Sequence, residues 1–173
     1  MISDSVLHTL RNTCRTLRII VLALATGVCI FAVIAVVQTK GRLTWEFPPV
    51  QIENAFFLLT GVMGLTGSFL VPAMMTSAAT PMTDNKQFGG EDRSEGLALR
   101  TASALQARTI VGCALLEGAA FSNLLAVFSH GYGPSLVLAG VLMSMIVFRF
   151  PTWDRYLEQI EAATRRSREK LNG

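Results

Sequence analysis

The chain has 173 residues, of which 51% are hydrophobic and only 16% are charged, and its mean hydropathy is +0.45. Soluble domains average about 25% charged residues, so this composition excludes an ordinary soluble globular protein. The net charge of +3 requires no nucleic-acid partner, because basic residues beside a membrane face anionic lipid headgroups.

Four apolar stretches account for the biased composition, and they cover residues 17–37, 55–79, 105–128 and 135–150. A membrane-spanning helix needs about 20 mostly apolar residues, within a range of about 17 to 25. Three stretches meet this length and the fourth is slightly shorter. The first is longer than the roughly 7–15 residues of a signal-peptide core and no small-x-small cleavage site follows it, so we expect it to be retained. The sequence predicts an all-α membrane protein with four transmembrane helices.

The basic residues predict the orientation of these helices. If the N-terminus is cytoplasmic, thirteen of the fifteen Lys and Arg residues lie in cytoplasmic segments, and only Lys40 and Arg42 lie outside. Basic residues concentrate in the cytoplasmic loops of membrane proteins. We therefore expect both termini to be cytoplasmic, in a multi-pass protein of the bacterial inner membrane that has the lipid bilayer as its first partner.

The segments between the apolar stretches differ in character. Residues 38–54 carry aromatic and proline residues and predict an outer loop, whereas the polar residues 80–101 predict a long cytoplasmic loop. The sequence His-Gly-Tyr-Gly-Pro over residues 130–134 predicts a tight turn, so the third and fourth helices should form a hairpin. We expect a four-helix transmembrane domain over residues 1–151 and a separate cytoplasmic tail over residues 152–173.

The tail has the pattern of an amphipathic helix. Its apolar residues recur at helical spacing, and they are Trp153, Tyr156, Leu157, Ile160 and Ala163. Charged residues take the other positions. Two interpretations stay open: a helix that lies on the membrane surface or contacts a partner, and a solvated tail without a partner.

Small residues recur at helical spacing in two of the apolar stretches, every fourth position in the third stretch and every third position in the second. In lipid, helices associate through such residues because they let two backbones approach closely. The third stretch carries Ala114, Gly118, Ser122 and Ala126, and the second carries Gly61, Gly64 and Gly67. These faces predict close helix packing, either between copies of the chain or within one chain.

Glu117 lies in the middle of the third apolar stretch. Ionising a carboxyl group in hydrocarbon without a partner costs desolvation energy, so we expect this one to be protonated at rest. No Lys, Arg or His shares its depth, since the nearest, Arg108 and Arg149, belong to the cytoplasmic boundary. Two roles stay open. Glu117 either carries protons or stays neutral and hydrogen-bonds a neighbouring helix through Asn123, Ser122 or Ser144.

Two motifs in residues 55–129 resemble the proteolipid c subunit of rotary ATP synthases. They are Gly-Val-Met-Gly-Leu-Thr-Gly over residues 61–67 and Ala-Leu-Leu-Glu-Gly-Ala-Ala over residues 114–120. The resemblance implies that Glu117 is the ion-carrying carboxylate and that the three glycines line the inner face of a ring of subunits. The first and fourth apolar stretches and the tail have no counterpart in the two-helix form of this family.

The expected function is therefore an integral membrane subunit that self-associates as a c-ring-like homo-oligomer and uses Glu117 in proton translocation or coupling. The alternative is a scaffold or accessory subunit that transports nothing and holds other membrane subunits. The chain has no phosphate-binding Gly-x-x-x-x-Gly-Lys loop and no His-Glu-x-x-His motif, so no soluble catalytic site or cofactor is expected. His8 and His130 fall on opposite sides of the membrane, which argues against a metal site.

Overall fold

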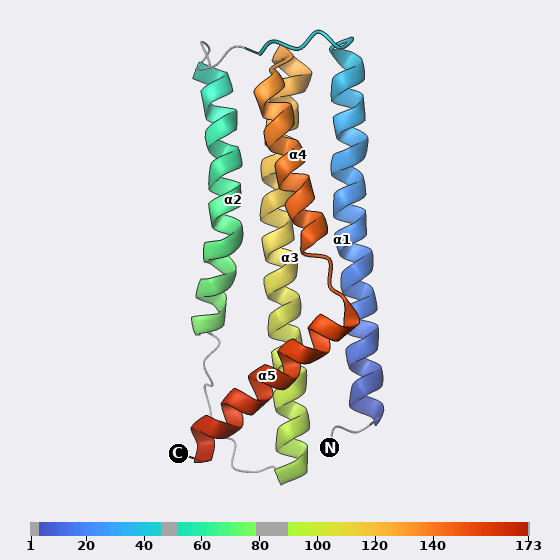
Figure 1. Cartoon of the computed structure of the whole chain (residues 1–173), viewed down its shortest axis with the longest axis vertical. Helices are drawn as coiled ribbons and strands as arrows, with labels where there is room; N and C mark the ends of the chain where they lie inside the picture. Colours follow the sequence, from blue (N-terminus) through green and yellow to red (C-terminus); the bar gives the residue numbers. More distant parts are fainter. Residues whose placement is uncertain (1–3, 46–51, 79–89, 173) are drawn as a thin grey trace.

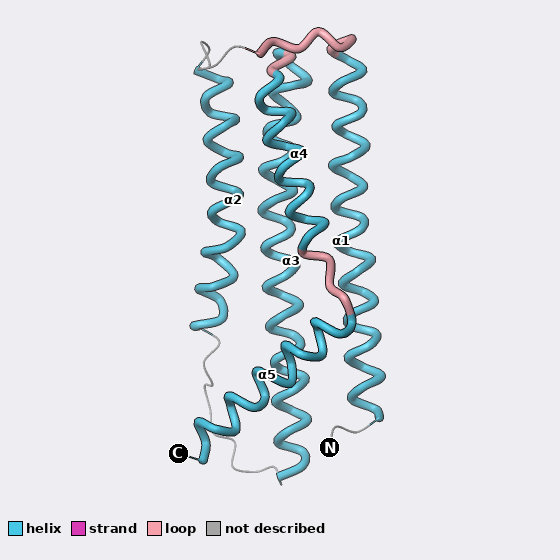
Figure 2. Tube along the Cα trace, in the orientation of Figure 1, coloured by secondary structure: helices cyan, strands magenta, loops and turns pink. Residues whose placement is uncertain are grey.

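The structure, a computed structural model, describes residues 4–45, 52–78 and 90–172. Its regular elements are five helices, and the described residues contain no strand (Figures 1 and 2). They are α1 (Asp4–Gln38), α2 (Ile52–Ala78), α3 (Gly90–His130), α4 (Gly133–Phe148) and α5 (Trp153–Asn172). The predicted all-α architecture is confirmed, and each predicted apolar stretch coincides over most of its length with one of the first four helices.

Three helices contain stretches that are long and apolar enough to cross a membrane: Val6–Gln38 in α1, Ile52–Met74 in α2 and Leu99–His130 in α3. A fourth span results only if α4 and α5 are counted together, although they meet at an angle of 69°. The described residues therefore contain three to four candidate spans, as expected for a multi-pass membrane protein.

Two helices extend well beyond the stretches that hydropathy predicts. α1 begins at Asp4, and α3 begins at Gly90 and reaches about 60 Å at 1.5 Å per residue. The predicted loop over residues 80–101 is therefore wrong from Gly90 onward, while residues 80–89 lie outside the described residues. Polarity alone indicated a loop there, but a helix that leaves the membrane stays stable when other helices cover its apolar side.

α3 is the central helix of the bundle, and it contacts each of the other four helices. α1 and α2 lie on opposite sides of it, and α4 packs against all three (Figure 1). α1 begins and α5 ends at the same end of the bundle, which we call the α5 end. We call the opposite end, where α3 turns into α4, the turn end.

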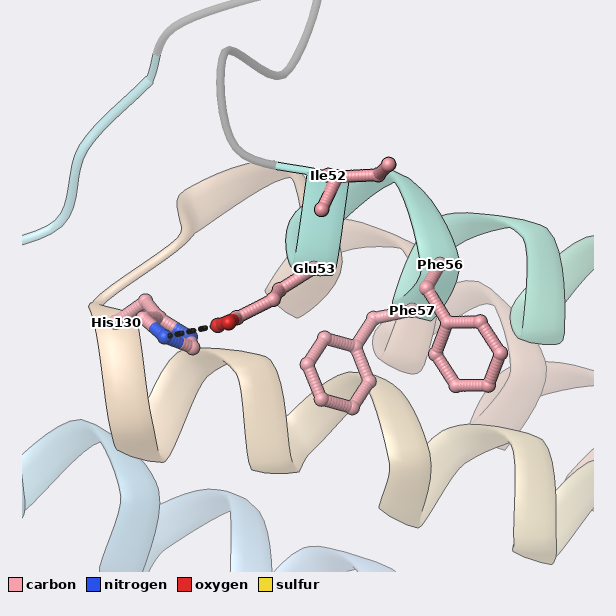
Figure 3. A pocket seen from close by; sticks show the side chains of 5 residues that line it. All are labelled: Ile52, Glu53, Phe56, Phe57 and His130. Carbon is pink, nitrogen blue, oxygen red and sulfur yellow. Dashed lines mark ion pairs between the residues drawn. The ribbon is translucent and has the colours of Figure 1, made fainter.

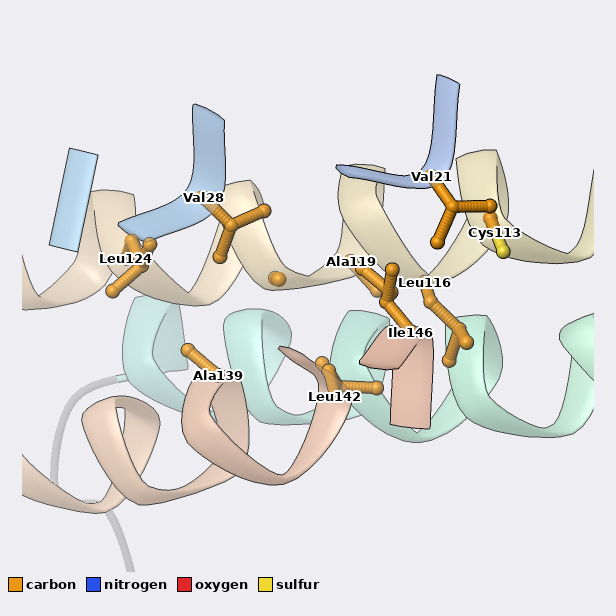
Figure 4. Packing of buried hydrophobic residues seen from close by; sticks show 10 residues of the cluster. Val21, Val28, Cys113, Leu116, Ala119, Leu124, Ala139, Leu142 and Ile146 are labelled. Atoms are coloured by element: carbon orange, nitrogen blue, oxygen red, sulfur yellow. The ribbon is translucent and has the colours of Figure 1, made fainter. Parts of the chain in front are cut away.

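The membrane-embedded core is formed by α1, α3 and α4. Its side chains interdigitate between these three helices (Figure 4), and the buried members are Val21, Val28, Cys113, Leu116, Ala119, Ala120, Leu124, Ala139, Leu142 and Ile146. α2 contributes no fully buried side chain to this cluster. Instead, the glycines of α2 let its backbone pack closely against α3.

The turn end is closed by a short backbone bridge. The Thr44 amide donates to the Gly131 carbonyl at 2.8 Å, and the Gly133 amide donates to the Thr44 carbonyl at 2.8 Å. Gly131 has a φ of +64°, and a Cβ there would lie 2.7 Å from the Arg42 carbonyl oxygen, so this turn requires glycine. The predicted tight turn between the third and fourth apolar stretches is confirmed.

A second apolar core lies at the α5 end, outside the membrane-embedded cluster. It joins the start of α1, the start of α3 and α5, and its buried residues are Val6, Leu10, Cys14, Ala102, Tyr156 and Ile160. The Tyr156 hydroxyl donates to the Ala102 carbonyl at 3.4 Å. The apolar face of the tail is thus covered by α1 and α3 of the same chain, which neither interpretation from the sequence anticipated.

Candidate functional site

Glu117 projects from α3 toward α1, where it faces a glycine. Its Oε1 atom lies 3.7 Å from the position that a Cβ on Gly27 would occupy. Glu117 is partly buried, so the side chain lies at the edge of the α1–α3 interface rather than deep within it. A methyl group on Gly27 would only touch the carboxyl group, so a side chain larger than that of alanine is needed to displace it.

Aromatic side chains bound this contact on the side of the turn end. The Phe121 Cζ atom lies 3.8 Å from the same point on Gly27, and the rings of Phe121 and Phe31 pack edge to face with centroids 5.4 Å apart. Val28, the neighbour of Gly27, belongs to the buried core. We call this contact of Glu117 with Gly27 and Phe121 the Gly27 niche, and the two residues that face Glu117 in it are apolar.

The depth of Glu117 follows from its position on α3. It lies about 20 Å along the helix axis from His130, in the interior of the candidate membrane span Leu99–His130. At this depth the side chain reaches neither surface. A carboxyl group here needs a proton, a cation or a hydrogen-bond donor.

None of the described residues supplies a hydrogen bond or an ion pair to the Glu117 carboxyl. Two candidate partners from the sequence are engaged elsewhere: Asn123 donates to the Ala119 carbonyl at 2.9 Å, and Ser144 donates to the Gly140 carbonyl at 2.8 Å. Arg149 donates to the Ser68 carbonyl at 2.9 Å. Within the part of the chain that the structure describes, the carboxyl group is available to a proton or to another subunit.

The small residues of α3 do not share one environment. Ala114 and Gly118 are exposed, and nothing lies within 4 Å of a Cβ built on Gly118. Ser122 is partly buried, whereas Ala126 is completely buried. The stripe therefore forms an open surface near Glu117 and an internal packing contact toward the turn end.

The glycines of α2 pack against the same chain. A Cβ on Gly61 would lie 2.6 Å from the Asn123 Nδ2 atom, and one on Gly64 would overlap Ala119 and lie 3.2 Å from the Leu115 carbonyl oxygen. Gly67 is less crowded, with the nearest atom of Leu115 at 3.9 Å. Gly61 and Gly64 thus provide close contact between α2 and the α3–α4 hairpin within one chain.

Sequence reasoning did not identify Gly27 as the neighbour of Glu117. One signal was present, because a glycine in the middle of an apolar helix costs about 1 kcal/mol relative to alanine and needs a reason to be there. Matching the depths of Gly27 and Glu117 on their helices would have found the pair.

A surface pocket lies at the turn end, far from Glu117 along α3. It has a volume of about 370 Å³ and is lined by Ile52, Glu53, Phe56, Phe57 and His130 (Figure 3). The Glu53 carboxylate and the His130 Nε2 atom are 3.0 Å apart and link the start of α2 to the end of α3. Among the described residues, no group of three His, Cys, Asp or Glu side chains is placed to hold a metal ion.

Comparisons with protein-family models, with curated proteins and with solved structures found no match.

Proposed function

We propose that this chain is a multi-pass subunit of the bacterial inner membrane that uses Glu117 to bind and release a proton during transport or coupling. The observation that carries the proposal is the Gly27 niche: a carboxyl group at membrane depth, against a glycine, without a described partner. Such a group can exchange a proton because no fixed charge holds it in one state.

The proposal includes self-association. Ala114 and Gly118 are exposed beside Glu117, so a second helix can approach this part of α3 closely. Because Gly61 and Gly64 are already used inside the chain, the association surface in this proposal is the exposed part of α3 rather than the glycine face of α2.

The proposed orientation places the α5 end in the cytoplasm. Both chain ends lie there, and thirteen of the fifteen Lys and Arg residues belong to that side in the four-span arrangement. Proton exchange at Glu117 would then take place closer to the cytoplasmic leaflet than to the outer one.

The second candidate is a scaffold without transport, and the core at the α5 end favours it. There, α1, α3 and α5 form a packed unit outside the membrane-embedded core, which gives other subunits a stable surface. In that case Glu117 is a neutral packing residue.

Glu117→Gln separates the two candidates, because the amide keeps the shape of the protonated acid and carries no exchangeable charge. The assay is proton uptake after an acid pulse in membrane vesicles that contain the assembled protein, with assembly checked by native gel. A proton-carrying role predicts normal assembly and lost uptake. Glu53→Gln, an acid at the turn end, is the matched control and should retain uptake. If Glu117→Gln assembles and takes up protons like the parent, the scaffold is the correct function.

A further inference from the structure

The guanidinium group of Arg149 is fixed between α2 and α3. Arg149 follows the last residue of α4, and its Nη2 atom donates to the Ser68 carbonyl at 2.9 Å and to the Ser68 hydroxyl at 3.3 Å. Its Nη1 atom lies where a Cβ on Gly112 would be. A glycine on α3 is therefore what allows the arginine to cross from α4 to α2.

Arg149 lies slightly inside the edge of the hydrocarbon layer. α4 has 16 residues and spans about 24 Å, which is less than the roughly 30 Å of a bilayer core. A long basic side chain normally extends to the headgroups from such a position. The Arg149 side chain is held against Ser68 instead. Its positive charge therefore has to be neutralised inside the edge of the hydrocarbon layer.

A second guanidinium lies nearby. Arg108 precedes Gly112 by one helical turn on the same face of α3, and it is exposed. Two like charges at this depth repel each other unless an anion lies between them. No carboxylate of the described residues forms an ion pair with either arginine, and the Nε and Nη1 groups of Arg149 have no described acceptor.

We propose that Arg108 and Arg149 form a binding site for the phosphate group of an anionic phospholipid in the leaflet at the α5 end. Guanidinium groups bind phosphate oxygens through two parallel hydrogen bonds, which suits the unused donors of Arg149. Basic sites between helices at a membrane boundary are where such headgroups bind.

The surroundings favour a lipid over a free phosphate ion. Arg149 lies over the ring of Phe69, with its Cζ atom 4.9 Å from the ring centroid. Phe69 is 53% exposed and belongs to an apolar face of α2 on which Val62, two helical turns earlier, is 50% exposed. An acyl chain can lie along this surface while the phosphate reaches the two arginines, whereas a free ion gains nothing from it.

The test is native mass spectrometry of the full chain in detergent, titrated with phosphatidylglycerol or with phosphatidylcholine of the same acyl chains. The parent should bind phosphatidylglycerol about tenfold more tightly than phosphatidylcholine, because the choline cation of phosphatidylcholine offsets its phosphate charge and is repelled by the two arginines. Arg149→Gln should remove this preference. Gly112→Ala should remove it as well, because the added methyl group displaces the guanidinium without changing any charge.

Arg15→Gln is the matched control, since Arg15 is an exposed arginine on α1 near the same leaflet. It should retain the preference. Arg149→Lys keeps the charge but loses the paired donors, so it should bind phosphatidylglycerol with intermediate affinity. If Arg149→Gln unfolds, Arg149→Lys is used in its place. The proposal fails if Gly112→Ala and Arg149→Lys keep the parent's preference, or if Arg15→Gln loses it equally. Displacement of the lipid by millimolar inorganic phosphate would contradict the lipid assignment.

Discussion

At the scale of single residues, glycines decide where the helices of this protein can meet. Gly27 lies against the Glu117 carboxyl, Gly112 lets Arg149 cross α3, and Gly64 brings α2 against Ala119. In a membrane, where water does not drive apolar helices together, such close backbone contacts carry much of the packing energy. Replacing these glycines should therefore have effects that depend on what lies opposite each one.

Gly64→Ala should destabilise the protein by about 1–3 kcal/mol, the usual cost of overpacking, because the new methyl group would overlap Ala119 and press on the Leu115 carbonyl. Gly67→Ala is the matched control on the same helix, since its methyl group would only touch Leu115 at 3.9 Å. Unfolding by sodium dodecyl sulfate, followed by circular dichroism, measures both. Equal stability of the two variants would contradict the close contact of α2 with α3 at Gly64.

Gly27→Leu should restrict access to Glu117, because the larger side chain would occupy the Gly27 niche. The reaction of Glu117 with a hydrophobic carbodiimide, measured by mass spectrometry of the labelled peptide, should slow severalfold. Thr26→Leu places the same side chain at the exposed position next to Gly27, about 100° around α1, and should leave the rate unchanged. A Gly27→Leu protein that reacts like the parent would show that Glu117 is reached from another side.

At the scale of secondary-structure elements, α5 holds the extended ends of α1 and α3 together. Ile160 is completely buried in the core at the α5 end, so Ile160→Ala should cost about 2–5 kcal/mol of local stability. Hydrogen exchange should then speed up in α5 and in the first turns of α3. Glu161→Ala, at the exposed neighbouring position, should change little. Unchanged exchange in Ile160→Ala would mean that the starts of α1 and α3 need no support from α5.

The elements also show how far the sequence predicts this fold. Apolar runs located the four helices of the bundle, and the Gly131–Gly133 turn marked the hairpin, because both signals are local. The extension of α3 back to Gly90 was missed, since a polar helix that gains its stability from α5 looks like a loop in a hydropathy profile. The sequence identified Glu117 as an acid within an apolar stretch. It could not identify the neighbour Gly27, because Gly27 lies on another helix and the contact depends on how the two helices pack.

At the scale of the whole molecule, the exposed part of α3 is the predicted surface for self-association. Gly118→Leu should leave the single chain folded, because nothing lies within 4 Å of that position, and it should reduce the oligomer seen by native mass spectrometry. Thr26→Leu serves again as the control, with a large side chain added to an exposed position on α1. If Gly118→Leu forms the same oligomer as the parent, association uses another face.

The orientation of the molecule can be checked independently. With the three native cysteines replaced, single cysteines at Thr44 and at Ser94 should react differently with an impermeant thiol reagent in intact cells. Both chain ends lie at the α5 end, so a cytoplasmic α5 end predicts labelling at Thr44 and none at Ser94. Labelling at Ser94 alone would reverse the proposed orientation.

Carbodiimide labelling as a function of pH measures directly whether Glu117 binds a proton at membrane depth. A hydrophobic carbodiimide enters the bilayer and reacts with the protonated carboxyl group, whereas ionised carboxylates at the surface react poorly. A proton-binding Glu117 predicts labelling that is concentrated at Glu117 at neutral pH, falls as the pH rises because the proton is lost, and disappears in Glu117→Gln. Labelling spread over the surface carboxylates, with Glu117 unmodified at every pH, would contradict it.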